Sequence, residues 1–65
     1  MSIEFRKNNN FRLSVIDNHL VGSIFNSSQG IWFEAIDEDQ EFSIEQLENI
    51  LAKMKELQSE VKNDN

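Results

Sequence analysis

The segment Phe11–Ile36 reads FRLSVIDNHLVGSIFNSSQGIWFEAI, and its pattern of apolar and polar residues decides the fold. Three stretches of it have the two-residue period of a β-strand: Phe11–Ile16, Leu20–Phe25 and Ile31–Ile36. The residues between them, Asp17-Asn18 and Asn26–Gly30, are of the types that favour tight turns. The segment therefore predicts three strands joined by two hairpins, an antiparallel meander.

A helix is predicted after the meander. Ser43 and Gln46 have the spacing of a capping box, which favours a helix that starts at this point. Apolar residues then recur at spacings of three and four, and two more widen the stripe: Leu47, Ile50, Met54, Leu57 and Val61, with Ile44 and Leu51 beside them. A stripe of this width is typical of a helix that packs on a sheet.

The N-terminal residues Ile3–Arg6 also alternate, and they would add a fourth strand. We therefore predict one α+β domain over residues 1–62. It would be a three-stranded antiparallel β-meander, four-stranded if Ile3–Arg6 pairs, with one C-terminal amphipathic α-helix packed on one face. Residues 63–65 are predicted to be a disordered tail.

The predicted sheet has apolar residues on both faces, although a single helix can cover only one. Strict alternation assigns one set to the helix side: Phe11, Leu13, Val15, Leu20 and Ile24. A second set is left for the other side: Ile16, Val21, Phe25 and either Trp32 or the pair Ile31 and Phe33. Because an exposed apolar face commonly marks an interface, we expect self-association or a dedicated partner at this face. Trp32 would be either a core residue or the anchor of that interface.

The charge of the chain is unevenly distributed. The 65 residues have a net charge of −6, and Leu13–Ala52 contains no Lys or Arg. The acidic residues of that stretch are Asp17, Glu34, Asp37, Glu38, Asp39, Glu41, Glu45 and Glu48. Such a surface disfavours nucleic acid and attracts a basic protein, although a solvated face that keeps a small protein in solution has the same composition.

Catalysis has little support in the sequence, and we expect no enzyme and no cofactor. The chain has no Cys and no Tyr, and its one histidine, His19, follows a predicted turn. No base and orienting group can be assigned to the serines. No apolar run is long enough to span a membrane, and the N-terminus lacks the apolar region of a signal peptide, so we expect a cytoplasmic protein that does not bind a membrane. We also expect no small-molecule substrate.

The segment Asp37–Glu48, DEDQEFSIEQLE, resembles part of an EF-hand calcium loop. Carboxylates occupy its positions one, three, five, nine and twelve, and a hard cation needs such oxygen ligands. Phe42 stands at the sixth position, where the EF-hand has Gly for a sharp turn. An acidic turn that leads into a capped helix explains the same residues without a metal.

These observations favour a non-catalytic, acidic protein-binding module. One version is a small inhibitor that mimics nucleic acid on a basic target, as phage-encoded accessory proteins do, which is an analogy of type alone. The alternatives are a calcium-responsive module built on Asp37–Glu48 and a purely structural homodimer. The predicted protein-binding residues are Val21, Phe25, Trp32, Glu34, Asp37, Glu38, Asp39, Glu41, Glu45 and Glu48, and no metal site is assigned.

Overall fold

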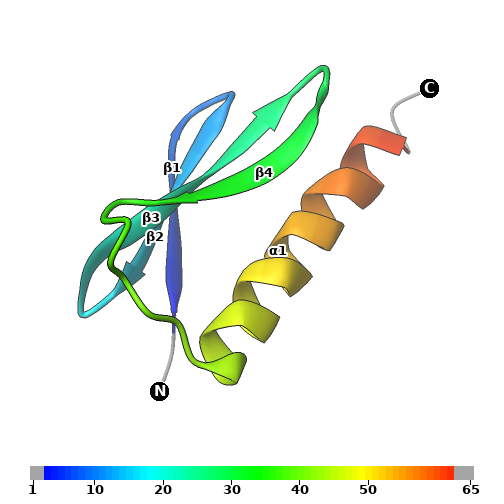
Figure 1. Ribbon diagram of the computed structural model, residues 1–65. Helices are drawn as coiled ribbons and strands as arrows, with labels where there is room; N and C mark the ends of the chain where they lie inside the picture. Colours follow the sequence, from blue (N-terminus) through cyan, green and yellow to red (C-terminus); the bar gives the residue numbers. More distant parts are fainter. Residues whose placement is uncertain (1–2, 63–65) are drawn as a thin grey trace.

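The computed structural model describes residues 3–62 of the chain, with the side chains of residues 3–60. Its elements are β1 (Glu4–Asn9), β2 (Arg12–Asp17), β3 (His19–Ser27), β4 (Gly30–Ala35) and α1 (Ile44–Lys62). The strands form one antiparallel sheet in the order β1-β2-β3-β4, and α1 lies along one face of it (Figure 1). The predicted α+β meander is confirmed, and its N-terminal strand makes the sheet four-stranded. The predicted tail, residues 63–65, lies outside the described residues.

The strands extend further than their apolar patterns indicate. β1 continues through Asn8 and Asn9, and β3 continues through Asn26 and Ser27 to a two-residue turn closed by the pair Ser27 and Gly30. Backbone pairing with a neighbouring strand satisfies the polar main chain whatever the side chain, so asparagines are tolerated at strand ends. At the β2–β3 hairpin Asn18 has φ of 68°, the left-handed conformation that asparagine adopts more readily than most residues.

The start of α1 is closed by a capping box, and one residue of the box also binds the sheet. The Ser43 amide donates to Oε1 of Gln46 at 2.8 Å, and the Gln46 amide donates to Oγ of Ser43 at 3.1 Å. The side-chain amide of Gln46 also donates to Oδ2 of Asp17 at 2.8 Å, and Asp17 is buried at the end of β2. One residue therefore completes the cap and satisfies a buried carboxylate from a distant hairpin.

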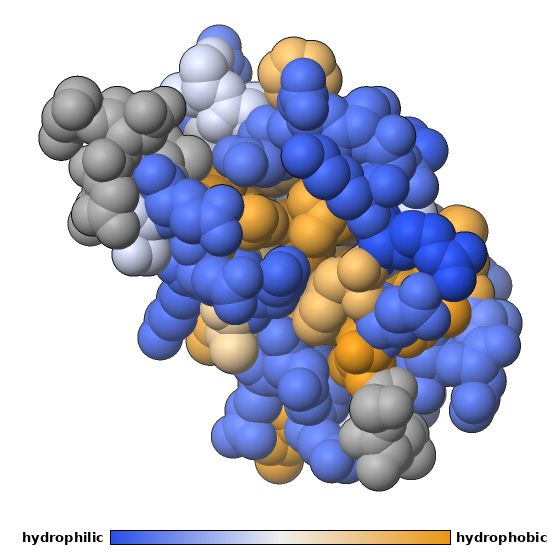
Figure 2. Space-filling view, turned by 180° about the vertical axis from the view of Figure 1, so that it is seen from behind, coloured by the Kyte–Doolittle hydropathy of each residue, from blue (hydrophilic) through white to orange (hydrophobic). Residues whose placement is uncertain are grey.

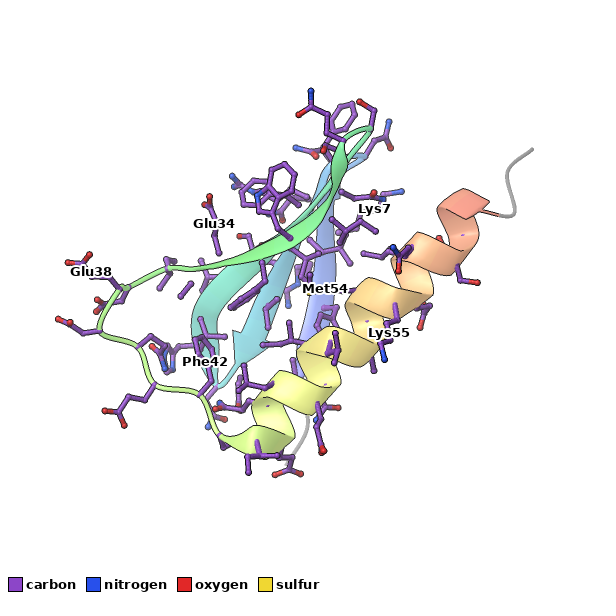
Figure 3. All side chains as sticks on the ribbon, turned by 45° about the vertical axis from the view of Figure 1, so that its right-hand side comes forward. Lys7, Glu34, Glu38, Phe42, Met54 and Lys55 are labelled. Carbon is purple, nitrogen blue, oxygen red and sulfur yellow. The ribbon has the colours of Figure 1, made fainter. Side chains whose placement is uncertain are left out.

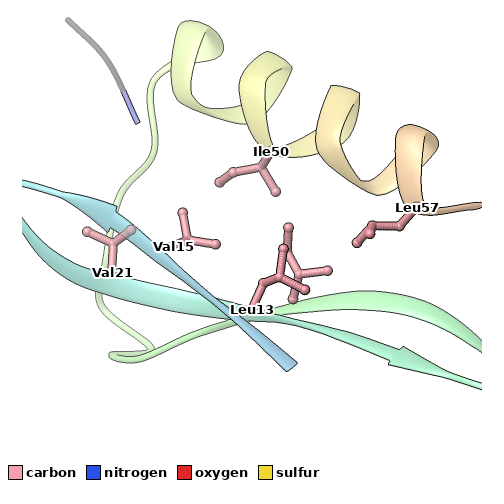
Figure 4. Packing of buried hydrophobic residues seen from close by; sticks show 6 residues of the cluster. Leu13, Val15, Val21, Ile50 and Leu57 are labelled. Atoms are coloured by element: carbon pink, nitrogen blue, oxygen red, sulfur yellow. The ribbon is translucent and has the colours of Figure 1, made fainter. Parts of the chain in front are cut away.

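The core is small and lies between α1 and the inner face of the sheet. Its buried apolar residues are Leu13, Val15, Val21, Ile24, Ile50 and Leu57. The side chains of Ile50 and Leu57 point from the helix toward the side chains of β2 and β3 (Figure 4). Phe33 and Phe42 extend the cluster, with their ring centroids 5.4 Å apart in an edge-to-face contact.

A β-bulge changes which side chains of β3 reach this core. Val15 pairs with Gly22 and Ile16 pairs with Leu20, so Val21 is an extra residue without a partner on β2. As a result Val21 is only 2% exposed and packs in the core, although strict alternation places it on the outer face. Leu20 lies opposite Ile16 on the outer face and is 41% exposed, so its predicted position under the helix is wrong as well.

The apolar stripe of α1 is also only partly buried. Ile50 and Leu57 lie at the centre of its contact with the sheet, whereas Ile44, Leu47 and Leu51 are exposed. Phe11, predicted to face the helix, lies in the β1–β2 turn and is exposed too. The reason is geometric: one helix touches a narrow sheet along one line, and residues on the flanks of its stripe extend beyond that line. Within residues 3–62, no helix is long and apolar enough to cross a membrane.

Candidate functional site

The outer face of the sheet, which α1 does not cover, has an aromatic row at one end. Arg12, Phe25 and Trp32 lie side by side on β2, β3 and β4. The rings of Phe25 and Trp32 are 6.3 Å apart and inclined by 28°, and the Arg12 guanidinium lies 5.9 Å from the Phe25 centroid. Trp32 is 43% exposed. The stack holds these rings in place while one of them stays accessible to solvent.

A polar row crosses the middle of the outer face. Cross-strand pairing places Arg6, Ser14, Ser23 and Glu34 next to one another on the four strands. Ser14 is buried because the Asn8 amide covers it and donates to its Oγ at 2.7 Å. Arg6 forms an ion pair with Glu4, in which Nη2 of Arg6 lies 2.8 Å from Oε2 of Glu4. Among the described residues, Glu34 has no ion-pair partner, so its carboxylate remains free to take one from another molecule.

A shallow hollow of about 310 Å³ lies on the outer face, and both rows contribute residues to its lining. Its lining includes Arg12, Leu20, Ser23, Phe25, Glu34 and Ile36. The Gly22 backbone also borders the hollow. The hollow therefore combines apolar side chains at both ends with one carboxylate, one hydroxyl and the Arg12 guanidinium.

The acidic residues lie on different parts of the molecule. Glu34 points away from α1, and Glu38 extends from the loop that follows β4 (Figure 3). Asp37, Asp39 and Glu41 are exposed in that same loop, whereas Glu45 and Glu48 are exposed on α1. The loop turns back on itself, because the Asp39 amide donates to Oδ1 of Asp37 at 3.0 Å. In the part of the chain that the structure describes, no group of three or more His, Asp or Glu side chains converges on a point that would hold a metal ion.

The predicted binding residues therefore separate into three groups. Phe25 and Glu34 line the outer hollow, and Trp32 stacks on Phe25 at an adjacent outward position on β4 without lining it. Val21 belongs to the core, and its placement on the outer face is wrong because of the bulge. The remaining predicted residues form the acidic loop and the exposed side of the helix: Asp37, Glu38, Asp39, Glu41, Glu45 and Glu48.

Arg12, Leu20 and Ile36 line the hollow but were absent from the predicted site. Arg12 has a detectable signal, since it alternates with Leu13 and so falls on the outer face. The sequence contains no such signal for Leu20, because Leu20 lies on the outer face only as a result of the bulge at Val21. Ile36 follows the last residue of β4 and stays near the sheet because its amide donates to the Val21 carbonyl at 3.0 Å.

Apolar surface is also present beyond the outer face. On the side of the molecule turned away from the viewer in Figure 1, apolar residues form a central band surrounded by hydrophilic ones (Figure 2).

Comparison with known proteins adds no relative. No family model matches the chain, and neither a curated protein nor a solved structure is significantly similar to it.

Proposed function

We propose that this chain is a non-catalytic protein-binding module that holds a basic protein through the outer face of its sheet. The observation that carries the proposal is the outer hollow, where Phe25 and Leu20 flank the unpaired carboxylate of Glu34. The face is exposed, is rigid because it is built on strands, and contains a stacked aromatic pair. Exposed aromatic anchors of this kind are common at the centres of protein interfaces.

The hollow suits a lysine or arginine side chain of the partner. The stem of such a side chain is apolar and would lie along Phe25 and Leu20, and its charged head would reach Glu34. A charge-assisted hydrogen bond in a partly desolvated hollow is stronger than an exposed surface ion pair. Arg12 is held over Phe25 at one end of the hollow, so the aromatic ring there already has a cation partner on its own chain.

The acidic loop after β4 supplies the longer-range attraction. Asp37, Glu38 and Asp39 follow Ile36, which lines the hollow, so the negative charge lies beside the apolar surface. Complementary charge of this kind speeds association and selects basic partners more than it raises affinity. The binding we propose is therefore strongly dependent on salt.

Affinity capture from cells that contain the protein tests this proposal. The wild type should retain a basic protein, and Glu34→Gln and Trp32→Ser should lose it while remaining folded. Ile44→Ser is the matched control, because Ile44 is exposed on α1 and does not line the hollow. Equal retention by all four proteins would show that the outer face is not the binding surface.

The inhibitor version of the proposal needs one further measurement. If the partner's basic surface normally binds nucleic acid, duplex DNA or RNA should compete with this chain for the captured protein. Direct competition, measured by fluorescence anisotropy with labelled nucleic acid, would support a nucleic-acid-mimicking inhibitor. Simultaneous binding of both would leave a protein-binding module without that role.

A further inference from the structure

The two edges of the sheet are protected to very different degrees. β1 carries Glu4, Arg6 and Lys7, and its register to β2 is broken by a bulge between Lys7 and Asn9. Charged side chains and bulges are the features by which proteins prevent an edge strand from pairing further. β4 has one charged residue, Glu34, no proline, and an unbroken register with β3. β4 is therefore an unprotected edge that can accept another strand.

The backbone of β4 offers a defined set of hydrogen-bonding groups at this edge. The Gly30 carbonyl accepts a bond from Ser27 Oγ at 3.1 Å, and the Ile36 amide donates to the Val21 carbonyl at 3.0 Å, so both point toward β3. Residues of an antiparallel strand alternate in this direction. Ile31, Phe33 and Ala35 consequently direct their amides and carbonyls away from β3, along the open edge.

A groove lies between the start of β4 and α1. Ile31, Leu51 and Met54 line it, together with Lys55 and Gln58, and it encloses about 190 Å³. Leu47 and Leu51, on the helix flank that borders it, are 48% and 50% exposed. The opposite flank faces β1, because Lys53 Nζ lies 5.7 Å from the Phe5 ring. The exposed apolar residues of α1 thus lie on the flank where the strand edge is unprotected.

We propose that a second copy of this chain covers this edge. The two β4 strands would pair antiparallel about a two-fold axis at Phe33 and extend the sheet across both copies. Ile31 lies beside Leu51 and Met54, while Phe33 contacts Phe42 just before the helix, so α1 runs opposite to β4 (Figures 1 and 3). An axis at Phe33 therefore passes close to Leu51 and brings the two helices side by side.

The charges near this axis are self-complementary, which favours a second copy over an unrelated strand. With Phe33 opposite Phe33, each Glu34 lies opposite Trp32 of the other copy and not opposite the other Glu34. Glu48 and Lys55, seven residues apart, occupy one column of α1 at the rim of the exposed flank. Antiparallel helices about the same axis set Glu48 of each copy against Lys55 of the other.

The size of the chain also favours a second copy as the partner at the β4 edge. A 65-residue domain without disulfides has little core, and small domains of this kind often gain stability by association. The pairing would bury Leu47 and Leu51 and fill the groove at Ile31. The pairing leaves the outer hollow of each copy open, so the dimer proposal does not rest on the proposed function. The two hollows would lie on the same side of the joined sheet.

Sedimentation equilibrium at tens of micromolar tests the dimer directly. We expect the wild type to be dimeric and Leu51→Lys to raise the dimer dissociation constant by roughly a hundredfold or more, because two buried anchors become opposed charges. Leu20→Lys is the matched control on the outer face and should stay dimeric. Far-ultraviolet circular dichroism must show that each variant is folded. A monomeric wild type, or a dimer that Leu51→Lys leaves intact, would overturn the proposal.

Charge exchange between copies tests the two-fold register. Glu48→Lys and Lys55→Glu should each weaken the homodimer by roughly tenfold, because each places like charges opposite one another. An equimolar mixture of the two variants should restore dimers, since each of these positions in one variant then meets the opposite charge in the other. Glu60→Lys, on the flank toward β1, changes the net charge as much as Glu48→Lys does and should have no effect. Failure of the mixture to recover would exclude this register.

Ala35→Pro tests the strand edge separately from the helices. The Ala35 amide points outward, so proline there leaves the β3–β4 pairing intact and removes only a bond to a further strand. We expect a folded monomer. A folded dimer of Ala35→Pro would mean that the copies meet through their helices alone and that the strand pairing proposed here is wrong.

Discussion

The two faces of the sheet contain similar apolar residues but differ in how deeply these residues are buried. On the inner face, Val15, Val21 and Ile24 are almost completely buried beneath the helix. On the outer face, Leu20, Trp32 and Ile36 remain exposed around a polar row. Adjacent residues of one strand thus face different surroundings, and the difference predicts that the outer apolar residues contribute less to the stability of the fold than the inner ones.

The largest expected effect is on the inner face. Ile24 is fully buried, so Ile24→Ala should lower the free energy of unfolding by about 3–4 kcal/mol through lost burial and a cavity. A domain of this size has little stability in reserve, and the variant should be largely unfolded at 37 °C. Thermal denaturation followed by circular dichroism measures this. A loss as small as that of an outer-face variant would remove the distinction between the two faces.

Gly22 tests how tightly the inner face is packed. A Cβ added there would lie 2.6 Å from the Phe33 ring and 2.5 Å from the Glu34 carbonyl oxygen. Because one of these contacts is backbone, Gly22→Ala should cost about 2 kcal/mol through overpacking. Chemical denaturation gives the value. Gly30→Ala is a useful contrast, since an added Cβ there meets nothing within 4 Å and only its positive φ is strained.

The helix start offers a matched pair of polar substitutions on the inner side. Gln46→Ala should cost about 2 kcal/mol, because it removes half of the capping box and leaves the buried Asp17 carboxylate without its donor. Ser43→Ala should cost about 1 kcal/mol, because it removes the N-cap alone. Urea denaturation of both proteins decides the order. Equal losses would mean that the link to Asp17 adds nothing to the cap.

An effect as small as that of Ser43→Ala is expected on the outer face, at the residue next to Ile24. Phe25→Ser should cost about 1 kcal/mol, the contribution of its contacts with Trp32 and Arg12, and the protein should remain folded. A red shift of the tryptophan emission should accompany it as Trp32 loses its stacking partner. If Phe25→Ser instead unfolds the domain, the outer face is part of the core in solution and is not a free binding surface.

Much of the fold follows from local patterns that the sequence contains. The strand periods, the turn residues and the capping box predict the elements and their antiparallel order, and the structure confirms them. Of the candidate site, Phe25 follows from the same alternation, because β3 is regular from Gly22 to its end. Alternation places Trp32 and Glu34 together on one face of β4 but leaves open which face, and the register with β3 decides it. Leu20 and Val21 do not follow, since no local signal distinguishes a bulge from an unbroken strand.

The sequence by itself determined which segments are strands and helix, because those preferences arise within a few residues along the chain. Only the tertiary structure decided which apolar residues are buried. The bulge at Val21 reverses the face of the residues before it, and the single line of contact between α1 and the sheet leaves Leu47 and Leu51 exposed. Both results depend on how separate elements meet in space, and the binding surfaces that we propose consist of the residues that this meeting leaves uncovered.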